Sequence, residues 1–263
     1  MTAQLIDIAV DSDDPEQSLT IRAYTRLRSS IISGELAPGQ RLKVESLRDI
    51  IAVGATPIRE ALSLLTSERL VERIDKRGFR VTEISLAEYE DLHRTRCLLE
   101  EHALRESIAS GDQAWEDRIV LVHHRFRRLP RTVSDAARGE RSNPEWERLH
   151  KAFHMSLLAA SPSKTVLQFC DQLHDRINRY RSVAAVGSMG HRDWKAEHDA
   201  ITEATLNRDV ELAVKELMQH YSATSDILQG TLNTQAAPRT HRKPGGADKQ
   251  PFTRERGRPL DNR

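Results

Sequence analysis

The chain has 263 residues, enough for two modest domains with terminal tails. Charged residues make up 30% and hydrophobic residues 38%, so helical cores can form although aromatic residues are few. No apolar run approaches membrane-spanning length and no signal-peptide layout opens the chain, so we expect a cytoplasmic protein without membrane contact. Cys97 and Cys170 are far apart and form no CxxC motif, which favours structural thiols over a disulfide.

The net charge of +1 is unevenly distributed along the chain. Residues 1–18 hold five acids and no bases, which predicts a disordered acidic leader. Residues 19–85 hold twelve Lys or Arg against eight acids, and residues 234–263 hold eight against three among several prolines and glycines. The composition of residues 234–263 therefore predicts a disordered basic tail. The excess of positive charge in residues 19–85 is consistent with a segment that binds nucleic acid.

Residues 19–67 show the pattern of a helix-turn-helix. Apolar residues recur at helical spacing from Leu19 and stop near Gly34. A short amphipathic helix follows over 44–51, then the small-residue turn 52–55. A second helix is expected to start at Thr56-Pro57, with the Thr56 side chain as its cap and Pro57 in its first turn. This succession is typical of a helix-turn-helix.

Two short strands are expected directly after these helices. Residues 70–74 and 79–84 alternate as strands do, and Asp75-Lys76-Arg77-Gly78 joins them as a hairpin turn. Gly78 stands where a positive φ is convenient. A helix-turn-helix followed by a basic hairpin is a winged helix, so we expect a winged helix-turn-helix domain over residues 19–85.

Several motifs of this segment resemble the DNA-binding domain of GntR-type bacterial transcription regulators. The matching motifs are Gly34-Glu35-Leu36-Ala37-Pro38-Gly39-Gln40-Arg41-Leu42, Pro57-Ile58-Arg59-Glu60-Ala61-Leu62 and Leu70-Val71-Glu72 with Arg77-Gly78-Phe79. The resemblance implies that the second helix enters the major groove and the wing contacts the minor groove or backbone. The resemblance also implies which residues contact DNA. They are Thr56 and Arg59 in that helix and Lys76, Arg77 and Gly78 in the wing. An arginine can bind guanine or phosphate bidentately. Alternatively, Arg59 is a surface partner of Glu60 or Glu68.

The chain departs from the usual family pattern at two places. Gly54-Ala55 stands where Ser-Arg is common, and the arginine often found near Glu45 is missing. We therefore expect an operator that differs from the common family sequence. Lys43, Arg48 and Arg28 are the candidates for compensating phosphate contacts.

A second, all-helical domain is expected over residues 86–233. Ser85 and Glu88 have the spacing of a helix-capping box, which marks the domain boundary. From there to about Leu232 we find no strand pattern. The expected helices are 86–109, 113–139, 143–160, 163–186, 191–207 and 209–230. The fold class is therefore mainly α, with a helical bundle after the winged helix.

Four histidines of this second domain form a candidate metal site. His150 and His154 are four residues apart and share one helix face, while His198 and His220 lie on later helices. Spacing alone leaves open that they are half-buried polar residues.

Motifs around these histidines resemble the FCD effector domain of the FadR branch of the same regulators. They are Arg96-Cys97-Leu98-Leu99-Glu100, Phe153-His154, Glu197-His198, Asn207-Arg208-Asp209 and Met218-Gln219-His220. The resemblance implies a divalent metal held by three histidines and an aspartate, here His154, His198 and His220 with His150 in place of the aspartate. Nitrogen ligands favour zinc or nickel over manganese, although the substitution puts metal binding itself in question.

A small organic acid is the expected effector, because an open metal position attracts a carboxylate and a guanidinium orients it. Arg96 matches the family's arginine on the first helix of the bundle. Arg94, Arg176, Arg179 and Arg181 are further candidates, with solvated surface arginines as the alternative.

The pattern predicts a ligand-responsive transcription repressor without catalytic residues. A homodimer would meet a pseudo-palindromic double-stranded operator, and the acid would alter the pose of the DNA-binding domains. The first alternative is a metal-dependent enzyme with a winged-helix interaction module, but no HExxH, nucleophile elbow or phosphate loop is present. The second is a winged-helix protein-interaction module that does not bind DNA.

Overall fold

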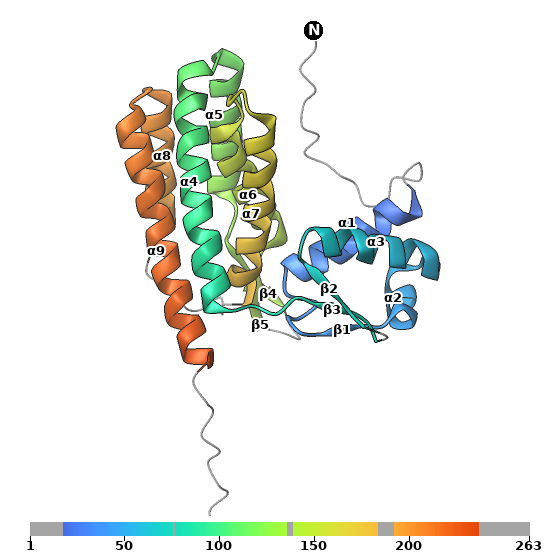
Figure 1. Ribbon diagram of the computed structural model, residues 1–263. Coiled ribbons are helices and arrows are strands. Elements are labelled where there is room, and N and C mark those ends of the chain that lie inside the picture. Colours follow the sequence, from blue (N-terminus) through green and yellow to red (C-terminus); the bar gives the residue numbers. More distant parts are fainter. Residues whose placement is uncertain (1–17, 76, 136–138, 184–191, 237–263) are drawn as a thin grey trace, which may run out of the picture.

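The computed structural model describes residues 18–75, 77–135, 139–183 and 192–236, which form a small N-terminal unit beside a helical bundle (Figure 1). The predicted acidic leader lies outside the described residues except for Ser18. The same holds for Lys76 and for the predicted tail beyond Ala236.

The N-terminal unit is a winged helix, which confirms the predicted fold class. A three-stranded antiparallel sheet with the order β1-β3-β2 packs beside three helices. The elements are α1 (Leu19–Ile32), β1 (Arg41–Leu42), α2 (Val44–Ile51), α3 (Ala55–Ser67), β2 (Val71–Ile74) and β3 (Gly78–Val81). Gly78 has a φ of +90°, so it takes the backbone conformation that the turn requires.

The helix α3 is held by its apolar face, as its spacing predicted. Ile58, Leu62 and Leu65 are fully buried, and α3 packs along α1. The predicted Thr56 cap is wrong. The cap lies two residues earlier, at Gly54, so the helix begins at Ala55, and Gly54 makes no side-chain cap hydrogen bond. A glycine before Ala-Thr-Pro already allows the extended backbone of the cap position, so Thr56 falls inside the first turn.

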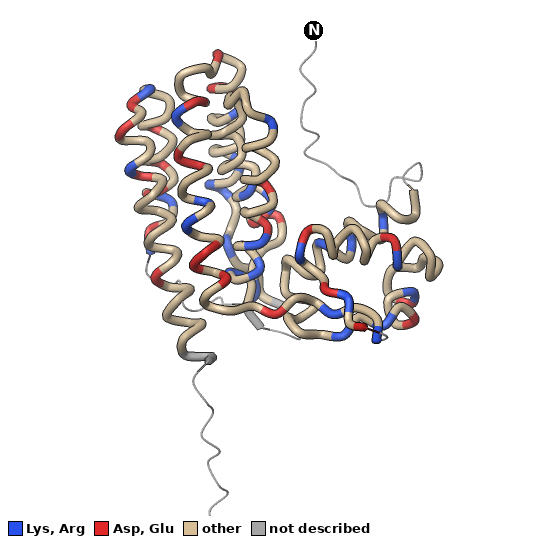
Figure 2. Tube along the Cα trace, viewed as in Figure 1, with Lys and Arg blue, Asp and Glu red and all other residues tan. Residues whose placement is uncertain are grey.

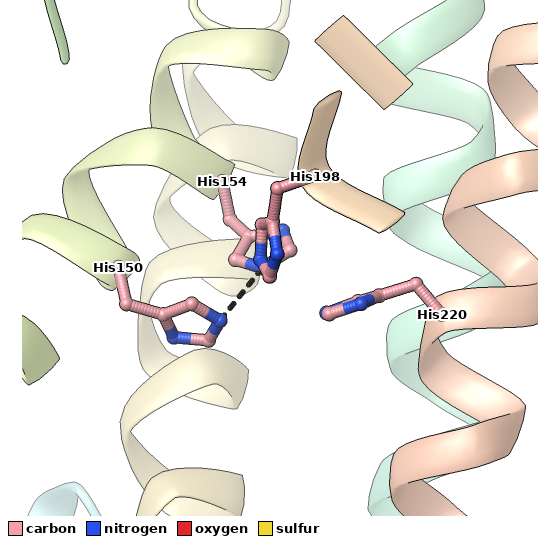
Figure 3. Close-up of side chains that lie close together, drawn as sticks. All are labelled: His150, His154, His198 and His220. Atoms are coloured by element: carbon pink, nitrogen blue, oxygen red, sulfur yellow. Dashed lines mark hydrogen bonds between the residues drawn. The ribbon is translucent and has the colours of Figure 1, made fainter. Parts of the chain in front are cut away.

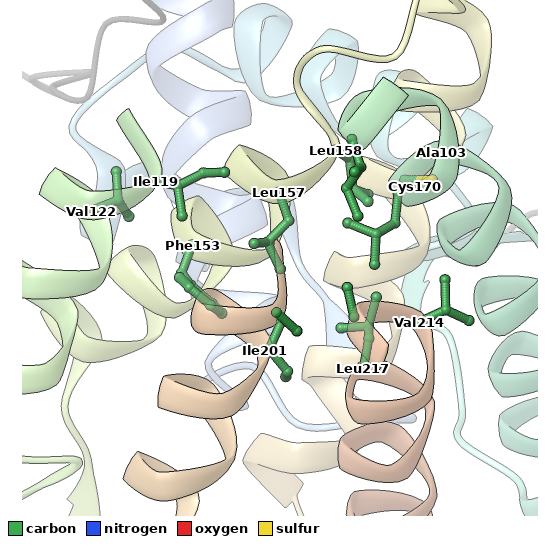
Figure 4. Close-up of a cluster of buried hydrophobic side chains, with 14 of the residues drawn as sticks. Ala103, Ile119, Val122, Phe153, Leu157, Leu158, Cys170, Ile201, Val214 and Leu217 are labelled. Atoms are coloured by element: carbon green, nitrogen blue, oxygen red, sulfur yellow. The ribbon is translucent and has the colours of Figure 1, made fainter. Parts of the chain in front are cut away.

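The second unit is a bundle of long helices, as predicted. Ser85 Oγ accepts a hydrogen bond from the backbone N–H of Glu88 and so caps the first helix. The helices are α4 (Leu86–Ser110), α5 (Gln113–Arg128), α6 (Pro144–Leu158), α7 (Lys164–Val183), α8 (Trp194–Leu206) and α9 (Val210–Ala236). Their facing sides form a buried apolar core that includes Phe153, Leu157 and Leu217 (Figure 4). The last helix runs to Ala236, so it extends past the predicted end at 230.

One segment of the bundle differs from the prediction. The helix expected over 113–139 ends at Arg128, and an antiparallel hairpin follows, formed by β4 (Thr132–Asp135) and β5 (Gly139–Ser142). Pro130 explains the end of the helix, because it disfavours helical backbone in the preceding residue and offers no N–H. The expectation that the second domain contains no strand is therefore wrong.

The two units touch through α1 and α7, which lie side by side in Figure 1. The Arg28 guanidinium on α1 binds the buried carboxylate of Asp175 on α7. The Arg179 guanidinium donates to the carbonyl oxygen of Thr82, 2.5 Å away, just after the sheet. The helix α7 therefore connects the interior of the bundle to the winged helix. In the described part of the chain, no helix is long and apolar enough to cross a membrane.

Candidate functional site

All four predicted histidine ligands meet inside the bundle. His150 and His154 project from α6, His198 from α8 and His220 from α9, and their rings converge in Figure 3. One ligand nitrogen from each ring can be chosen such that all four lie within 4.8 Å of one another. Residues up to 70 positions apart are thus brought to one point by the packing of three helices.

Three of these rings are oriented by an acceptor at Nδ1. His198 Nδ1 donates to the Trp194 carbonyl oxygen over 2.5 Å, and His220 Nδ1 donates to a Glu197 carboxylate oxygen over 2.8 Å. His154 Nδ1 lies 3.1 Å from the Tyr221 hydroxyl, whose own proton goes to the Glu100 carboxylate. A neutral imidazole with its proton on Nδ1 leaves a lone pair on Nε2, the state that a metal ligand needs.

The chemistry of this donor set fits a divalent metal. Burial in the core lowers the pKa of His154, His198 and His220 well below 6.5, and neighbouring cationic and histidine side chains lower it further. The three rings are therefore neutral at pH 7. His198 Nε2 is a buried atom without a hydrogen-bond partner in the described chain, which is the state expected of a ligand position. Nitrogen donors suit zinc or nickel.

A cavity opens beside the histidines and is strongly basic. Its volume is about 370 Å³, including solvent-filled space at its mouth, and Trp146 and Trp194 are among the residues that line it. Four arginines line it, namely Arg96, Arg131, Arg181 and Arg192. Burial, and to a lesser degree the nearby Arg181, lower the pKa of Arg131 to about 10.

Arg96 is the cavity arginine that the sequence singled out. Its Nε binds the buried Glu100 carboxylate over 2.8 Å, and its guanidinium lies 3.9 Å from the centre of the Tyr221 ring. Burial disfavours the charged form of Arg96, but Glu100 and Tyr221 outweigh this and raise its pKa. Its Nη2 is buried without a partner in the described residues, and so is Arg181 Nε. Both can donate to an anion.

Of the further arginines proposed from the sequence, Arg181 lines the cavity, whereas Arg94, Arg176 and Arg179 lie elsewhere. Arg94 is exposed and pairs with Asp91, 3.2 Å away. Arg176 binds Glu88 over 2.6 Å, and Arg179 contacts the winged helix as described above. The helical period explains why Arg94 and Arg179 miss the cavity that Arg96 and Arg181 line. A shift of two residues turns a side chain by about 200° around the helix.

The sequence analysis missed three residues at this site. Arg131 and Arg192 stand in connecting segments without a periodic pattern, so no local signal marks them. Arg192 binds Glu197 and donates to Thr224 Oγ1 over 2.6 Å. His174 on α7 is buried next to His150, and neither of its ring nitrogens has a partner in the described chain. Its seven-residue spacing from Arg181 was a signal that both face the same side of the helix.

The predicted DNA-contact residues that the structure describes lie on the surface of the winged helix. All six are exposed, namely Lys43, Arg48, Thr56, Arg59, Arg77 and Gly78. Figure 2 shows Lys and Arg along this unit, interspersed with acidic residues. In the described chain Arg59 has no ion pair, whereas Glu60 binds Thr20 and Glu68 binds Tyr24 and Arg28. The alternative reading of Arg59 as a partner of those acids therefore has no support in the structure.

A winged helix with exposed basic side chains, joined to a helical bundle with a basic cavity, is the architecture of a ligand-responsive DNA-binding regulator. Family comparison supports this class directly. Residues 19–81 match the family described as bacterial regulatory proteins of the gntR family, and residues 91–223 match the FCD domain. The chain belongs to the GntR family and carries an FCD effector domain.

Named relatives agree with this assignment. The uncharacterised HTH-type transcriptional regulator BphR of Paraburkholderia xenovorans (strain LB400) is 36% identical, over 81% of this chain and 86% of that protein. The HTH-type transcriptional repressor GlaR of Escherichia coli (strain K12) is 32% identical, over 80% and 96%. Among solved structures, E. coli McbR/YncC has a TM-score of 0.66 at 19% identity, over 81% of this chain and 98% of that one, which shows the fold alone.

Proposed function

We propose that this regulator is a repressor that leaves its operator when a small organic acid binds, together with a divalent metal, in the histidine and arginine cavity. Residues 19–85 would contact the DNA and residues 86–233 would hold the effector. Two copies of the chain would bind two matched half-sites, since a two-fold symmetric protein requires a pseudo-palindromic site.

The proposal of an acid rests on two buried guanidinium nitrogens of the cavity that lack a partner among the described residues, Arg96 Nη2 and Arg181 Nε. Such donors are costly to bury unless an acceptor reaches them. Three of the cavity arginines pair with carboxylates set behind them, namely Arg96 with Glu100, Arg181 with Glu147 and Arg192 with Glu197. The described residues that line the cavity itself include four arginines and no carboxylate, which favours an anionic ligand over a neutral or cationic one.

The metal would be held by His154, His198 and His220, whose Nε2 lone pairs are available. Zinc or nickel suits these nitrogen donors better than manganese. A bound divalent ion would supply a Lewis-acidic position for a carboxylate oxygen. The arginines would orient the same carboxylate through paired hydrogen bonds, so that binding depends on both.

The helix α7 offers the route from the cavity to the DNA-binding unit. Arg181 lines the cavity near the end of α7. Asp175 and Arg179 on the same helix bind Arg28 and the Thr82 carbonyl oxygen of the winged helix. An acid that draws Arg181 toward itself would therefore favour a different pose of α7 and, with it, of the winged helix. DNA affinity would change by the difference in acid affinity between the two poses.

Operator release tests this function. An operator would first be selected from random duplexes with the full chain, and its complex would then be titrated with mono- and dicarboxylates in the presence of zinc. We expect at least one acid to lower operator affinity and to be recovered unchanged. Consumption of the acid would favour the metal-dependent enzyme instead. Binding to duplex DNA that did not weaken with salt would favour a protein-interaction module.

A further inference from the structure

His150 differs from the other three histidines in what its Nδ1 faces. In the other three rings, Nδ1 lies against an acceptor, namely the Trp194 carbonyl, the Glu197 carboxylate or the Tyr221 hydroxyl. His220 Nδ1 also lies 3.1 Å from Arg192 Nη2, but the Glu197 carboxylate is closer, at 2.8 Å, and accepts its proton. The His150 Nδ1 lies 2.9 Å from Nη1 of Arg181, and a guanidinium can only donate. The proton of the neutral ring is therefore placed on the opposite nitrogen.

The opposite nitrogen of His150 has a matching acceptor. Its Nε2 lies 3.0 Å from His154 Nε2, the contact drawn in Figure 3. Because His154 carries its own proton on Nδ1, its Nε2 is a lone pair that accepts from His150. The chain of donors therefore runs in one direction, from Arg181 through His150 to His154.

The position of the His150 ring is fixed by its neighbours. It stacks on Trp146 with the ring centres 4.7 Å apart and the planes 11° apart, and the side chain is 4% exposed. Arg181 also lies over Trp146, 5.4 Å from its ring centre. A turn of the imidazole that brought Nδ1 to an acceptor would break both contacts.

We propose that His150 is not a ligand of the metal but a hydrogen-bond donor of the effector cavity, held in that role by Arg181. The inference rests on the proposed function, since it assigns a role within the same site. A ligating imidazole needs a lone pair on the nitrogen that faces the ion, and Arg181 places a proton there. When the His154 lone pair is given to an ion, His150 Nε2–H becomes available to a second acceptor.

The acceptor that fits is an oxygen anion, such as one carboxylate oxygen of the acid. His150 lines the cavity together with Arg96 and Arg181, so a carboxylate there could receive charge-assisted bonds from the arginines and one further bond from the imidazole. A cationic or donor-only ligand would meet donors on every side. In this arrangement Arg181 has two roles, since its Nη1 positions the proton of His150 while its Nε can donate to the acid.

The tautomer can be measured without metal or effector. Full-length protein with ¹⁵N-labelled histidine would be studied in chelator by two-bond nitrogen–hydrogen correlation, with the signals assigned from His150→Gln and His198→Gln. We expect His150 to carry its proton on Nε2 and His198 on Nδ1. A proton on Nδ1 of His150 would overturn the proposal. Replacement of Arg181 by Met should move the His150 proton toward Nδ1, an effect that a merely structural arginine would not produce.

A titration with zinc alone separates ligand from donor. We expect His150→Ala to bind zinc within about threefold of the parent, whereas His198→Ala should weaken binding by about 100-fold or more. An equal loss in both variants would overturn the proposal. If the parent itself bound no zinc, the metal-assisted function would fail, and the tautomer measurement would still decide whether His150 is a donor.

Discussion

The surface of α3 and the cavity of the bundle are built in opposite ways. Thr56 and Arg59 are exposed neighbours on one helix, and their side chains are positioned by a local motif. The cavity residues come from α4, α6, α7, α8, α9 and the connecting segments, and the histidines among them are almost fully buried. Changes on the surface should therefore act on DNA affinity alone, whereas changes in the cavity should act on metal, effector and stability together.

The largest effect is expected from the double variant His198→Ala/His220→Ala. Loss of two lone-pair donors should abolish zinc binding, seen as a metal content near zero by elemental analysis, while helix content stays largely intact. His102→Ala, which changes an exposed histidine of α4, is the matched control and should keep its metal. Undiminished metal in the double variant would remove the site from this region.

The buried histidines should also make the metal-free protein sensitive to acid. The pKa of His150, His154, His174, His198 and His220 is lowered from 6.5, chiefly by burial, so the unfolded chain binds protons that the folded chain does not. Stability is then complete above about pH 6.5 and falls below it. At pH 5.5 the loss relative to high pH is about 1.4 kcal/mol for each ring that stays neutral.

Thermal unfolding in chelator between about pH 7.5 and 5.5 measures this loss. The double variant His198→Ala/His220→Ala removes two of the rings, so its melting temperature should fall less than that of the parent over the same range. Equal slopes would mean that these histidines do not remain neutral in the fold.

Arg59→Ala tests the DNA side of the comparison. Loss of a side chain that binds guanine or phosphate should weaken operator affinity by about 1–3 kcal/mol, or about 5- to 150-fold, with metal content and melting temperature unchanged. Arg94→Ala is the control, because Arg94 is an equally exposed arginine on the bundle. Operator affinity equal to that of the parent would show that α3 does not read DNA through Arg59.

Asp175→Asn tests whether the contact between the two units couples acid binding to DNA affinity. The substitution weakens the contact with Arg28 and the 2.6 Å contact with Lys151, while Arg28 keeps Glu68. We expect acid binding to persist and the acid-induced drop in operator affinity to shrink by about 1 kcal/mol or more. Operator titrations with and without acid measure both quantities, and an unchanged drop would place the coupling elsewhere.

The winged helix could be predicted from sequence because its signals are local. The periodic apolar residues of α3, the turn at Gly78 and the charged wing all lie within short windows. The start of α3 was misplaced, β3 ends at Val81 and not at 84, and the two-residue strand β1 was not predicted. The hairpin of β4 and β5 was missed because Pro130 was overlooked as the end of α5. A helix pattern that continues past a proline is a weak guide to where the helix stops.

The cavity could be predicted only in part. The four histidines were found from spacing and resemblance, and the structure brings them together. Arg131 and Arg192 could not be found, since they reach the cavity from loops whose course depends on tertiary packing. Nor could any spacing reveal that Arg181 faces His150 Nδ1, because the direction of a hydrogen bond depends on the relative rotation of two helices.

The most direct test of metal-assisted acid binding is a thermal-shift screen of the full chain against small mono- and dicarboxylates, with zinc and with chelator. A ligand that binds only the folded state stabilises it by about 2.7 kcal/mol at about 100 times its Kd. We expect at least one acid to raise the melting temperature of the parent protein in the presence of zinc. The same acid should leave the melting temperature unchanged in chelator and in the variant His198→Ala/His220→Ala. An acid that raised it equally with chelator would contradict a role for the metal and leave Arg96 and Arg181 as the binding groups.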